Sequence, residues 1–467
     1  MNVTEVLQFA DNLVFAKTGE HLDDLKQAIL RGVWQHQKYS KVAEEYHCTE
    51  GHVKDVASEL WKLLSDILGE ELNKSNFRST MERWQFSNVS YFEKAILQIN
   101  NVNASADTFN SPNYNYTETG NNETRPTANV KPKLDLAEMP QPGVFYNRTQ
   151  ELTALEQWII EEHCHLVTIW GIAGIGKTAL AVQLVEQIKD KFEYVIWHSL
   201  RNSPSLETIQ INLIEFLSHQ EETELPTNSN RKRSPLIHHL QKHRCLIILD
   251  DVQTILSSGQ LAGNIKAGYE DYSAWFRQIA ELSHHSCIVL LSWEKPREIA
   301  TLESENKSVR CWQLQGLGAE AEEIFKAKGL VEEPEWLQLI NYYQGNPLWL
   351  KIITATIQDL FNGKVSDLLQ YDPLFLSEDI YYVLSQQFNR LSDLEKQVMY
   401  ILASETDPVP MSKLLERTQL LPADLFNAVQ SLGRRSLIEK PAGNLAIFTL
   451  QPALKQYVKC HYARTLA

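Results

Sequence analysis

The feature that most constrains this chain is the segment Gly171-Ile-Ala-Gly-Ile-Gly-Lys-Thr178, which has the pattern G-x-x-x-x-G-K-T. An apolar stretch, Leu166–Trp170, precedes it, and residues 179–188 after it are apolar at helical spacing. A strand, a glycine loop and a helix in this order form a unit whose loop N–H groups surround phosphate oxygens. The segment therefore predicts a phosphate-binding loop within an α/β domain.

The residue types in this loop suit contacts with a nucleotide polyphosphate. Glycines let backbone N–H groups curl around phosphate oxygens, and the helix N-terminus adds partial positive charge. The ammonium of Lys177 can reach the β- and γ-phosphates, and the hydroxyl of Thr178 can bind Mg²⁺. The predicted cofactor-binding residues of the loop are Gly171, Gly174, Ile175, Gly176, Lys177, Thr178 and Ala179.

A second motif, Leu246-Ile-Ile-Leu-Asp-Asp251, leads four apolar residues into two carboxylates. Ligands of open parallel sheets bind at the carboxyl ends of the strands, so both acids are expected beside the loop. Asp250 is predicted to hold Mg²⁺ together with Thr178, and Asp251 to orient or activate the attacking water. With Lys177, these two aspartates are the predicted catalytic residues.

From about residue 134 onward, apolar strands alternate with helical segments. The strands are continuous apolar runs rather than alternating ones, which favours a parallel sheet with helices on both faces. We therefore predict an α/β core of the P-loop NTPase class. The predicted strands are 165–171, 194–200, 244–252, 286–292 and 309–314.

Residues 1–100 have helical periodicity, and a short helix, a turn and a longer helix near residues 40–68 indicate a helix-turn-helix. Such a unit either presents a helix to the DNA major groove or docks on another protein. Residues 1–100 hold 11 Lys and Arg against 15 Asp and Glu, so DNA binding is possible but a protein partner is favoured. Residues 101–133 are rich in Asn, Thr and Pro, which predicts a disordered linker.

The overall composition excludes several classes of protein. The net charge of −15 argues against broad attraction to nucleic acid or anionic lipid. The N-terminus lacks the pattern of a secretory signal, and no apolar run approaches the ~20 residues needed to cross a bilayer. The six cysteines are scattered without a C-x-x-C pair, so neither a zinc site nor a disulfide framework is expected. We predict a cytoplasmic protein without a membrane partner.

The loop and the acidic strand together resemble the NB-ARC nucleotide switch of the STAND class of ATPases. The segment Gly345-Asn-Pro-Leu-Trp-Leu350 resembles that family's G-x-P-L motif, which implies that Pro347 packs on the adenine. The segment Val144-Phe-Tyr-Asn-Arg148 resembles the family's segment whose backbone contacts the adenine edge, here through Val144 and Phe145.

The resemblance extends over most of the chain. Residues 378–467 resemble the family's winged helix, and residues 1–90 resemble the helix-turn-helix of vWA-MoxR-associated proteins, which occurs fused to NB-ARC modules in cyanobacteria. The expected domains are an N-terminal helix-turn-helix domain (1–100), a linker (101–133), an NB-ARC core (134–316), a helical lid (317–376) and a winged helix (377–467).

The resemblance implies binding of ADP or ATP with Mg²⁺ and slow hydrolysis of ATP. It further implies a closed ADP-bound monomer and an open ATP-bound form that assembles into a homo-oligomer, with the N-terminal module contacting a protein partner as the output. Two alternatives remain open. One is a transcription regulator that places its helix-turn-helix on DNA under ATP control, and the other is a scaffold whose ADP is structural.

Two positions depart from the family pattern. Trp293 stands where the family usually has an arginine that senses the γ-phosphate, and Lys295 or Arg297 are candidate substitutes. Gln451 stands where relatives carry the histidine of a Met-His-Asp triplet that contacts the β-phosphate. A neutral amide anchors phosphate less strongly than a charged group, so both departures bear on hydrolysis and switching more than on binding.

Overall fold

The computed structural model describes residues 7, 10, 14, 22–34, 39–46, 48–68, 72–74, 77, 132–218, 235–371, 374–440 and 446–466. The chain divides into two compact units, Met1–Thr124 and Arg125–Ala467, and each is described by itself. The predicted linker, 101–133, lies outside the described residues except for its last two positions.

The N-terminal unit contains three described helices, α2 (Asp24–Trp34), α3 (Tyr39–Glu45) and α4 (Glu50–Leu68). Their apolar sides meet in a core of fully buried residues that includes Leu30, Val53 and Leu60. A short turn joins α3 to α4, and the indole N–H of Trp61 donates to the Tyr39 hydroxyl at 3.1 Å, which ties these two helices together. The predicted helix-turn-helix is confirmed.

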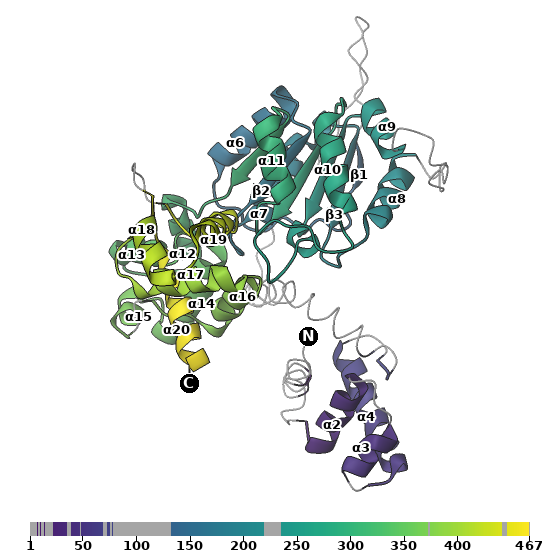
Figure 1. The fold of residues 1–467 in the computed structure, drawn as a ribbon, viewed down its shortest axis with the longest axis vertical. Helices are drawn as coiled ribbons and strands as arrows, with labels where there is room; N and C mark the ends of the chain where they lie inside the picture. Colours follow the sequence, from purple (N-terminus) through teal and green to yellow (C-terminus); the bar gives the residue numbers. More distant parts are fainter. Residues whose placement is uncertain are drawn as a thin grey trace, which may run out of the picture. The chain divides into compact units, whose positions relative to one another are not determined.

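The C-terminal unit is built on a six-stranded sheet in which every neighbouring pair is parallel (Figure 1). The strand order is β1-β3-β4-β5-β2-β6. The strands are β1 (Lys133–Asp135), β2 (Leu166–Trp170), β3 (Tyr194–Ser199), β4 (Cys245–Asp250), β5 (Cys287–Ser292) and β6 (Val309–Gln313). Five of them coincide with the predicted strands. The short edge strand β1 was not predicted, because its three residues are partly exposed and give no continuous apolar run.

Successive side chains of the strands point to opposite faces of the sheet, and each face carries its own helices. Val167 and Ile169 of β2 face α6 (Thr149–Glu156), η1 (Gln157–Glu161) and α7 (Lys177–Ile188). The opposite face is covered by α8 (Leu206–Leu217), α9 (Pro235–Lys242), α10 (Asp271–Glu281) and α11 (Arg297–Glu305) (Figure 1). Two 3₁₀ turns, η2 (Lys189–Lys191) and η3 (Val252–Ile255), complete the core.

Helices follow the sheet in the region predicted to be a lid, which stays a prediction: η4 (Ala319–Ala321), α12 (Glu322–Ala327), α13 (Glu333–Tyr342), α14 (Pro347–Phe361) and α15 (Val365–Tyr371). The C-terminal region contains α16 (Glu378–Phe388), α17 (Asp393–Ser404), α18 (Met411–Thr418), α19 (Pro422–Arg434) and α20 (Pro452–Leu466). A small antiparallel sheet, β7 (Val409–Pro410) with β8 (Ile447–Phe448), lies among them. The apolar cluster on the α7 face of the large sheet continues into both regions. The winged-helix assignment of 377–467 stays a prediction.

A helix that crosses a bilayer must be both long and apolar. Among the residues that the structure describes, no helix meets both requirements.

Candidate nucleotide-binding site

The glycine loop leaves the buried end of β2 and enters α7 at Lys177, as the sequence predicts. Gly174 and Gly176 have φ angles of +78° and +100°, a backbone conformation that side chains disfavour. A Cβ atom on Gly174 would lie 2.7 Å from the Cβ atom of Leu348. The glycine therefore serves both the turn and the close approach of helix α14.

Every carbonyl of the loop from residue 171 to residue 176 is held by a donor from the protein. Lys177 Nζ donates to the carbonyls of Gly171 and Ile172 at 2.9 and 3.2 Å, and Leu180 N donates to that of Gly176 at 2.9 Å. Groups from elsewhere hold the other three carbonyls: Asn346 Nδ2 bonds Ala173 (3.0 Å), Leu348 N bonds Gly174 (3.3 Å) and Arg148 Nη2 bonds Ile175 (2.8 Å).

Several N–H groups of the same loop, in contrast to its carbonyls, are unpaired. Among the described residues, the backbone N–H groups of Gly174, Gly176, Lys177 and Thr178 have no hydrogen-bond partner. Unpaired N–H groups at a helix N-terminus attract an anion, because their partial charges and the helix dipole have the same sign there. This set of donors fits a polyphosphate.

The ammonium of Lys177 lies inside this loop, and its residue is only 8% exposed. Burial lowers the pKa of Lys177 to about 8, although the charges of Asp250 and Asp251 act in the opposite direction. A buried cation with two carbonyl oxygens as its hydrogen-bond partners is incompletely neutralised. A phosphate oxygen in reach of this ammonium would complete its neutralisation.

The first aspartate of the acidic motif meets the loop at Thr178. The Thr178 hydroxyl donates to Asp250 Oδ2 at 3.0 Å, and the backbone N–H of Asp251 donates to Oδ1 at 2.7 Å. Burial, and then the neighbouring Asp251 charge, raise the pKa of Asp250 to about 7. A hydroxyl beside a carboxylate offers the hard oxygen ligands that Mg²⁺ prefers. The donor set fits Mg²⁺, with phosphate and water oxygens as its remaining ligands.

The carboxylate of Asp251 is held by three donors from neighbouring strand ends. Its Oδ2 accepts from Ser199 Oγ at 3.3 Å and from Arg201 Nε at 3.2 Å, and its Oδ1 accepts from Gln253 Nε2 at 2.8 Å. The backbone of Asp251 is left-handed, with a φ of 59°. Gln253 also accepts from the backbone N–H of Trp293 at 3.2 Å, so this network spans β3, β4 and β5.

Two side chains that support the loop were missed at the sequence level. Arg148, 4% exposed, donates through Nη1 to the Gln315 carbonyl at 2.9 Å and to Glu151 Oε1 at 3.0 Å, in addition to its bond to Ile175. Asn346, 1% exposed, accepts from the first N–H groups of α14 while its Nδ2 donates to the loop. The pattern Asn-Pro at a helix start indicates an N-cap. Nothing in the sequence indicates that the Arg148 and Asn346 side chains hydrogen-bond the carbonyls of the phosphate loop.

The remaining predicted residues differ in how closely they approach the loop. Pro347 is the first residue of α14, and its Cγ lies 3.9 Å from the point that a Gly176 Cβ would occupy. Val144 is 69% exposed, and Phe145 packs against the edge of the apolar core. Gln451 precedes α20 and hydrogen-bonds the carboxyl of Glu439. The nucleotide contacts of Val144, Phe145, Pro347 and Gln451 stay predictions, as does that of Ala179, which is exposed in the first turn of α7.

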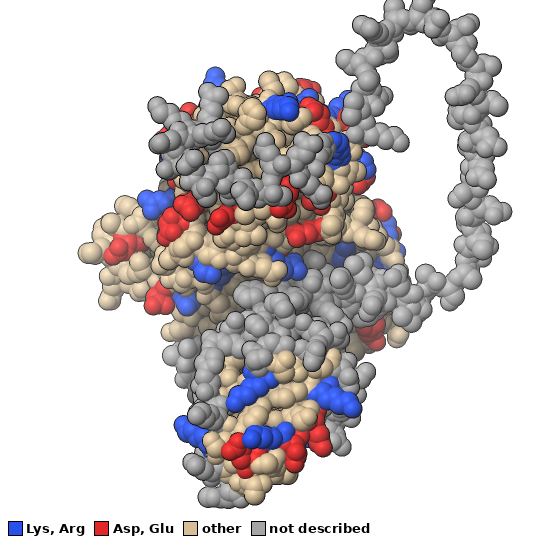
Figure 2. Space-filling model, turned by 90° about the vertical axis from the view of Figure 1, so that its right-hand side faces the viewer, with Lys and Arg blue, Asp and Glu red and all other residues tan. Residues whose placement is uncertain are grey.

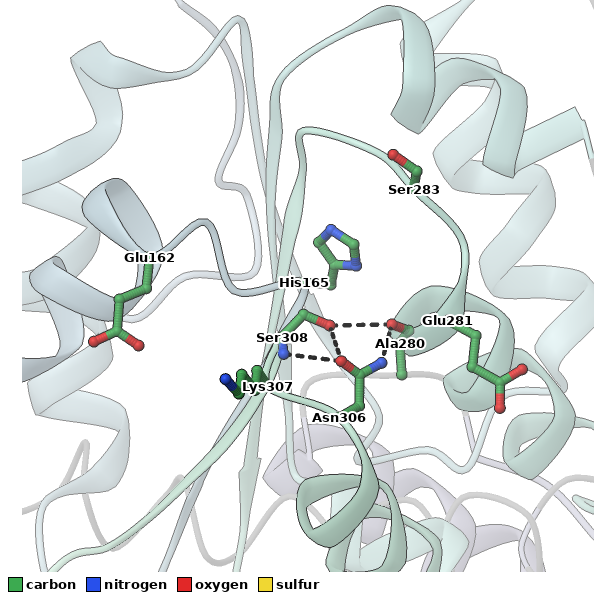
Figure 3. A pocket seen from close by; sticks show the side chains of 8 residues that line it. All are labelled: Glu162, His165, Ala280, Glu281, Ser283, Asn306, Lys307 and Ser308. Atoms are coloured by element: carbon green, nitrogen blue, oxygen red, sulfur yellow. Dashed lines mark hydrogen bonds between the residues drawn. The ribbon is translucent and has the colours of Figure 1, made fainter.

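A hollow of about 420 Å³ lies at the opposite, amino-terminal edge of the sheet (Figure 3). His165 and Ser308 line it just before β2 and β6. Its polar groups largely bond one another: Asn306 Nδ2 and Ser308 Oγ both donate to the Ala280 carbonyl, at 2.7 and 3.1 Å. The hollow is separate from the phosphate loop.

A second buried polar cluster joins the sheet domain to the C-terminal helices. We call Glu294, Arg390, Glu395 and Arg435 the ion cluster. Glu294 follows β5, and its Oε1 and Oε2 lie 2.6 Å from Arg390 Nη2 and 2.5 Å from Arg435 Nη1. Arg435 Nε also pairs with Glu395 Oε1 at 2.9 Å, and both glutamates are at most 1% exposed.

Comparison with known proteins gives two family matches. Residues 148–273 match the NB-ARC domain, and residues 1–84 match the N-terminal helix-turn-helix of vWA-MoxR-associated proteins. An uncharacterized WD repeat-containing protein of Nostoc is 41% identical over 345 residues, which cover 71% of this chain and 27% of the relative. The disease resistance protein RRS1 of Arabidopsis thaliana is 25% identical over 51% of this chain and 17% of its own length.

Among solved structures, a STAND protein with a tetratricopeptide repeat sensor from Pyrococcus horikoshii matches with a TM-score of 0.34 and 21% identity, over 69% of this chain and 43% of that protein. The chain spans about a quarter or less of the two relatives named above. Both family matches confirm the expected resemblance. The chain therefore carries a vWA-MoxR-associated helix-turn-helix domain followed by an NB-ARC domain, which implies nucleotide binding.

Proposed function

We propose that this chain is a nucleotide-controlled switch of the STAND class, closed with ADP and open with ATP. The observation that carries the proposal is the direct bonding of the lid to the phosphate loop. Asn346 Nδ2 and Leu348 N hold the carbonyls of Ala173 and Gly174. A change in the loop on nucleotide exchange would therefore act on helix α14 without any intermediate element.

The loop residues have distinct roles in this proposal. The unpaired N–H groups of the loop would bind phosphate oxygens, and Lys177 would turn from its two carbonyls toward the β- and γ-phosphates. Thr178 and Asp250 would hold Mg²⁺, which neutralises phosphate charge when bound. Asp251 would orient the water for slow hydrolysis of ATP, a reaction that depends on positioning and charge neutralisation.

The ion cluster would stabilise the closed state, because opening would separate its buried ion pairs at a cost in free energy. Breaking a buried ion pair by removing one partner costs about 3–5 kcal/mol. Moving a population from 1:99 to 99:1 takes about 5.5 kcal/mol of differential binding. These energies are of similar size, so we propose that a partner or signal assists ATP in opening the switch.

The N-terminal domain would be the output of the switch through a protein partner. Residues 22–68 contain six Lys and Arg against eight Asp and Glu. Acidic and basic side chains lie next to one another on the visible face of this unit (Figure 2), and Lys54 pairs with Glu50 at 2.8 Å. A DNA-binding face is usually basic, so the mixed charge favours a protein. Assembly of the ATP form into a homo-oligomer would raise the local concentration of these domains.

The test is to identify the nucleotide retained by the purified full chain and to measure its mass by light scattering with ADP or with ATPγS and Mg²⁺. We expect retained ADP, a monomer with ADP and a larger species with ATPγS. Lys177→Ala should abolish retention, whereas Lys191→Ala, at an exposed lysine just beyond α7, should not.

Retention of nucleotide by Lys177→Ala would contradict the site. Retained ADP with no change of mass on exchange would instead support a scaffold with structural ADP. Trp293 favours this second function, because a neutral side chain at the family's sensor position supplies no charge for a γ-phosphate.

A further inference from the structure

If the chain binds ATP as proposed above, the negative charges that meet at the carboxyl edge of the sheet must be neutralised. A γ-phosphate would bring further negative charge close to Asp250 and Asp251. Like charges a few ångströms apart repel strongly in a partly buried site. Lys177 and the Mg²⁺ proposed at Thr178 and Asp250 would offset part of this charge, and a protein cation beside Asp251 would offset more of it.

The two candidates expected from the sequence do not approach the acidic pair. The Lys295 ammonium pairs with Glu303, and its backbone N–H donates to the Arg434 carbonyl at 2.9 Å. Arg297 is exposed at the start of α11, and its charge acts on Arg434, whose pKa is lowered by burial and then by Arg297. Neither residue has a contact with Asp250 or Asp251 among the described residues.

Three further arginines, two of them buried and one half-buried, are also committed. Arg148 donates to Gln315, Ile175 and Glu151, and Arg390 and Arg435 belong to the ion cluster.

Arg201 is positioned differently. It lies two residues beyond Ser199, the last residue of β3, which is level with Asp250 in the sheet register. The Leu200 N–H donates to the Asp250 carbonyl at 2.8 Å, so this strand end lies directly beside the acidic pair. The Arg201 side chain is 32% exposed and bonds Asp251 through Nε. Among the described residues, its Nη1 and Nη2 have no hydrogen-bond partner, which leaves four N–H donors available.

We propose that Arg201 is the cation that pairs with the γ-phosphate of ATP and thereby sets the preference for ATP over ADP. The planar guanidinium can bond two phosphate oxygens at once. Its Nε would leave Asp251 as the phosphate is engaged. Ser199 and Gln253 would keep the Asp251 carboxylate in place, ready to orient water.

The test compares affinities of the full chain for ADP and for ATPγS, with Mg²⁺, by titration of each nucleotide. Arg201→Ala and Arg201→Gln should weaken ATPγS binding about tenfold or more, the effect of one lost charge-assisted hydrogen bond, with ADP binding within about twofold. Arg201→Gln retains a neutral donor for Asp251, and Arg201→Lys should restore part of the ATPγS affinity through its charge.

Arg310→Ala is the matched control. The Arg310 side chain is 31% exposed and pairs with a carboxylate, Glu162, at 3.1 Å, but it lies at the amino end of β6. Both affinities should be unchanged in this variant.

An equal loss for both nucleotides in the Arg201 variants, no loss, or the same loss in Arg310→Ala would overturn the proposal while leaving nucleotide binding intact. Failure of the unchanged protein to bind either nucleotide would overturn the proposed function as well.

Discussion

At the scale of single residues, Gly174 combines two constraints that can be separated by experiment. Its φ of +78° disfavours any side chain, and a Cβ there would lie 2.7 Å from Leu348 Cβ and 2.9 Å from Asn346 Oδ1. Gly268 has a similar φ of +87°, but a Cβ there would meet nothing within 4 Å. The two glycines therefore share the backbone strain but not the crowding.

We predict that Gly174→Ala lowers stability more than Gly268→Ala and also abolishes ADP retention. The backbone strain alone costs about 1–3 kcal/mol in either variant. Thermal melting of both variants, with ADP release measured in parallel, checks this. Equal melting midpoints would show that the lid does not crowd the loop.

Asn346 offers a second test at this scale, because its two side-chain atoms do different things. Oδ1 accepts from the N-terminus of α14, and Nδ2 donates to the loop at Ala173. Asn346→Asp keeps the helix cap but loses the donor, whereas Asn346→Ala loses both, and a lost cap alone costs about 1 kcal/mol. We predict that both variants release ADP faster, and that Asn346→Ala also melts at a lower temperature. An unchanged ADP off-rate in Asn346→Asp would exclude a role for the donor.

At the scale of elements, the loop between α10 and β5 contains a buried histidine that resists protonation. His284 is 5% exposed, and its ring stacks on that of His165 at 4.1 Å between centroids. Its Nε2 lies 3.0 Å from the Ile279 carbonyl, and the Ser286 N–H donates to Nδ1 at 3.2 Å. Burial, followed by the charge of His165, lowers the pKa of His284 to about 4.

This histidine predicts a loss of stability in acid. The unfolded chain binds a proton near pH 6.5 and the folded chain only near pH 4, so the contribution is full above pH 6.5 and declines as the pH falls. The loss amounts to about 3 kcal/mol at most. Melting curves of the unchanged protein and of His284→Gln between pH 7.5 and pH 4.5 check this, with exposed His285→Gln as the control. A parallel decline in His284→Gln would assign the loss to other groups.

Most of the strands, and part of the candidate site, can be predicted from the sequence. Continuous apolar runs predict β2 to β5, because a strand covered on both faces is largely apolar, whereas the edge strand β6 also contains Arg310 and Gln313. The motifs likewise place Thr178 beside Asp250, because both follow strands of one parallel sheet. Arg148, Arg201 and Asn346 could not be assigned in this way, since their partners lie far away in the chain and depend on how the elements pack. The short edge strand β1 leaves no periodic signal at all.

At the scale of the whole molecule, the ion cluster connects the sheet domain with the C-terminal helices. Glu294→Gln would leave Arg390 and Arg435 buried with reduced compensation. We predict that this variant assembles at a lower ATPγS concentration and is cleaved faster by protease in its ADP form. Glu298→Gln, which breaks the surface pair with Arg277, is the control. Assembly at an unchanged ATPγS concentration would show that the cluster does not oppose opening.

The hydrogen bonds between the lid and the phosphate loop affect the rate of nucleotide release as well as the affinity. Because α14 is hydrogen-bonded to the carbonyls of Ala173 and Gly174, we predict that release of ADP from the proposed switch requires this helix to detach first. The residence time of the ligand would then follow the frequency of that detachment and would be insensitive to how fast free nucleotide diffuses. A partner that pulls on α14 would thus act as an exchange factor without touching the nucleotide.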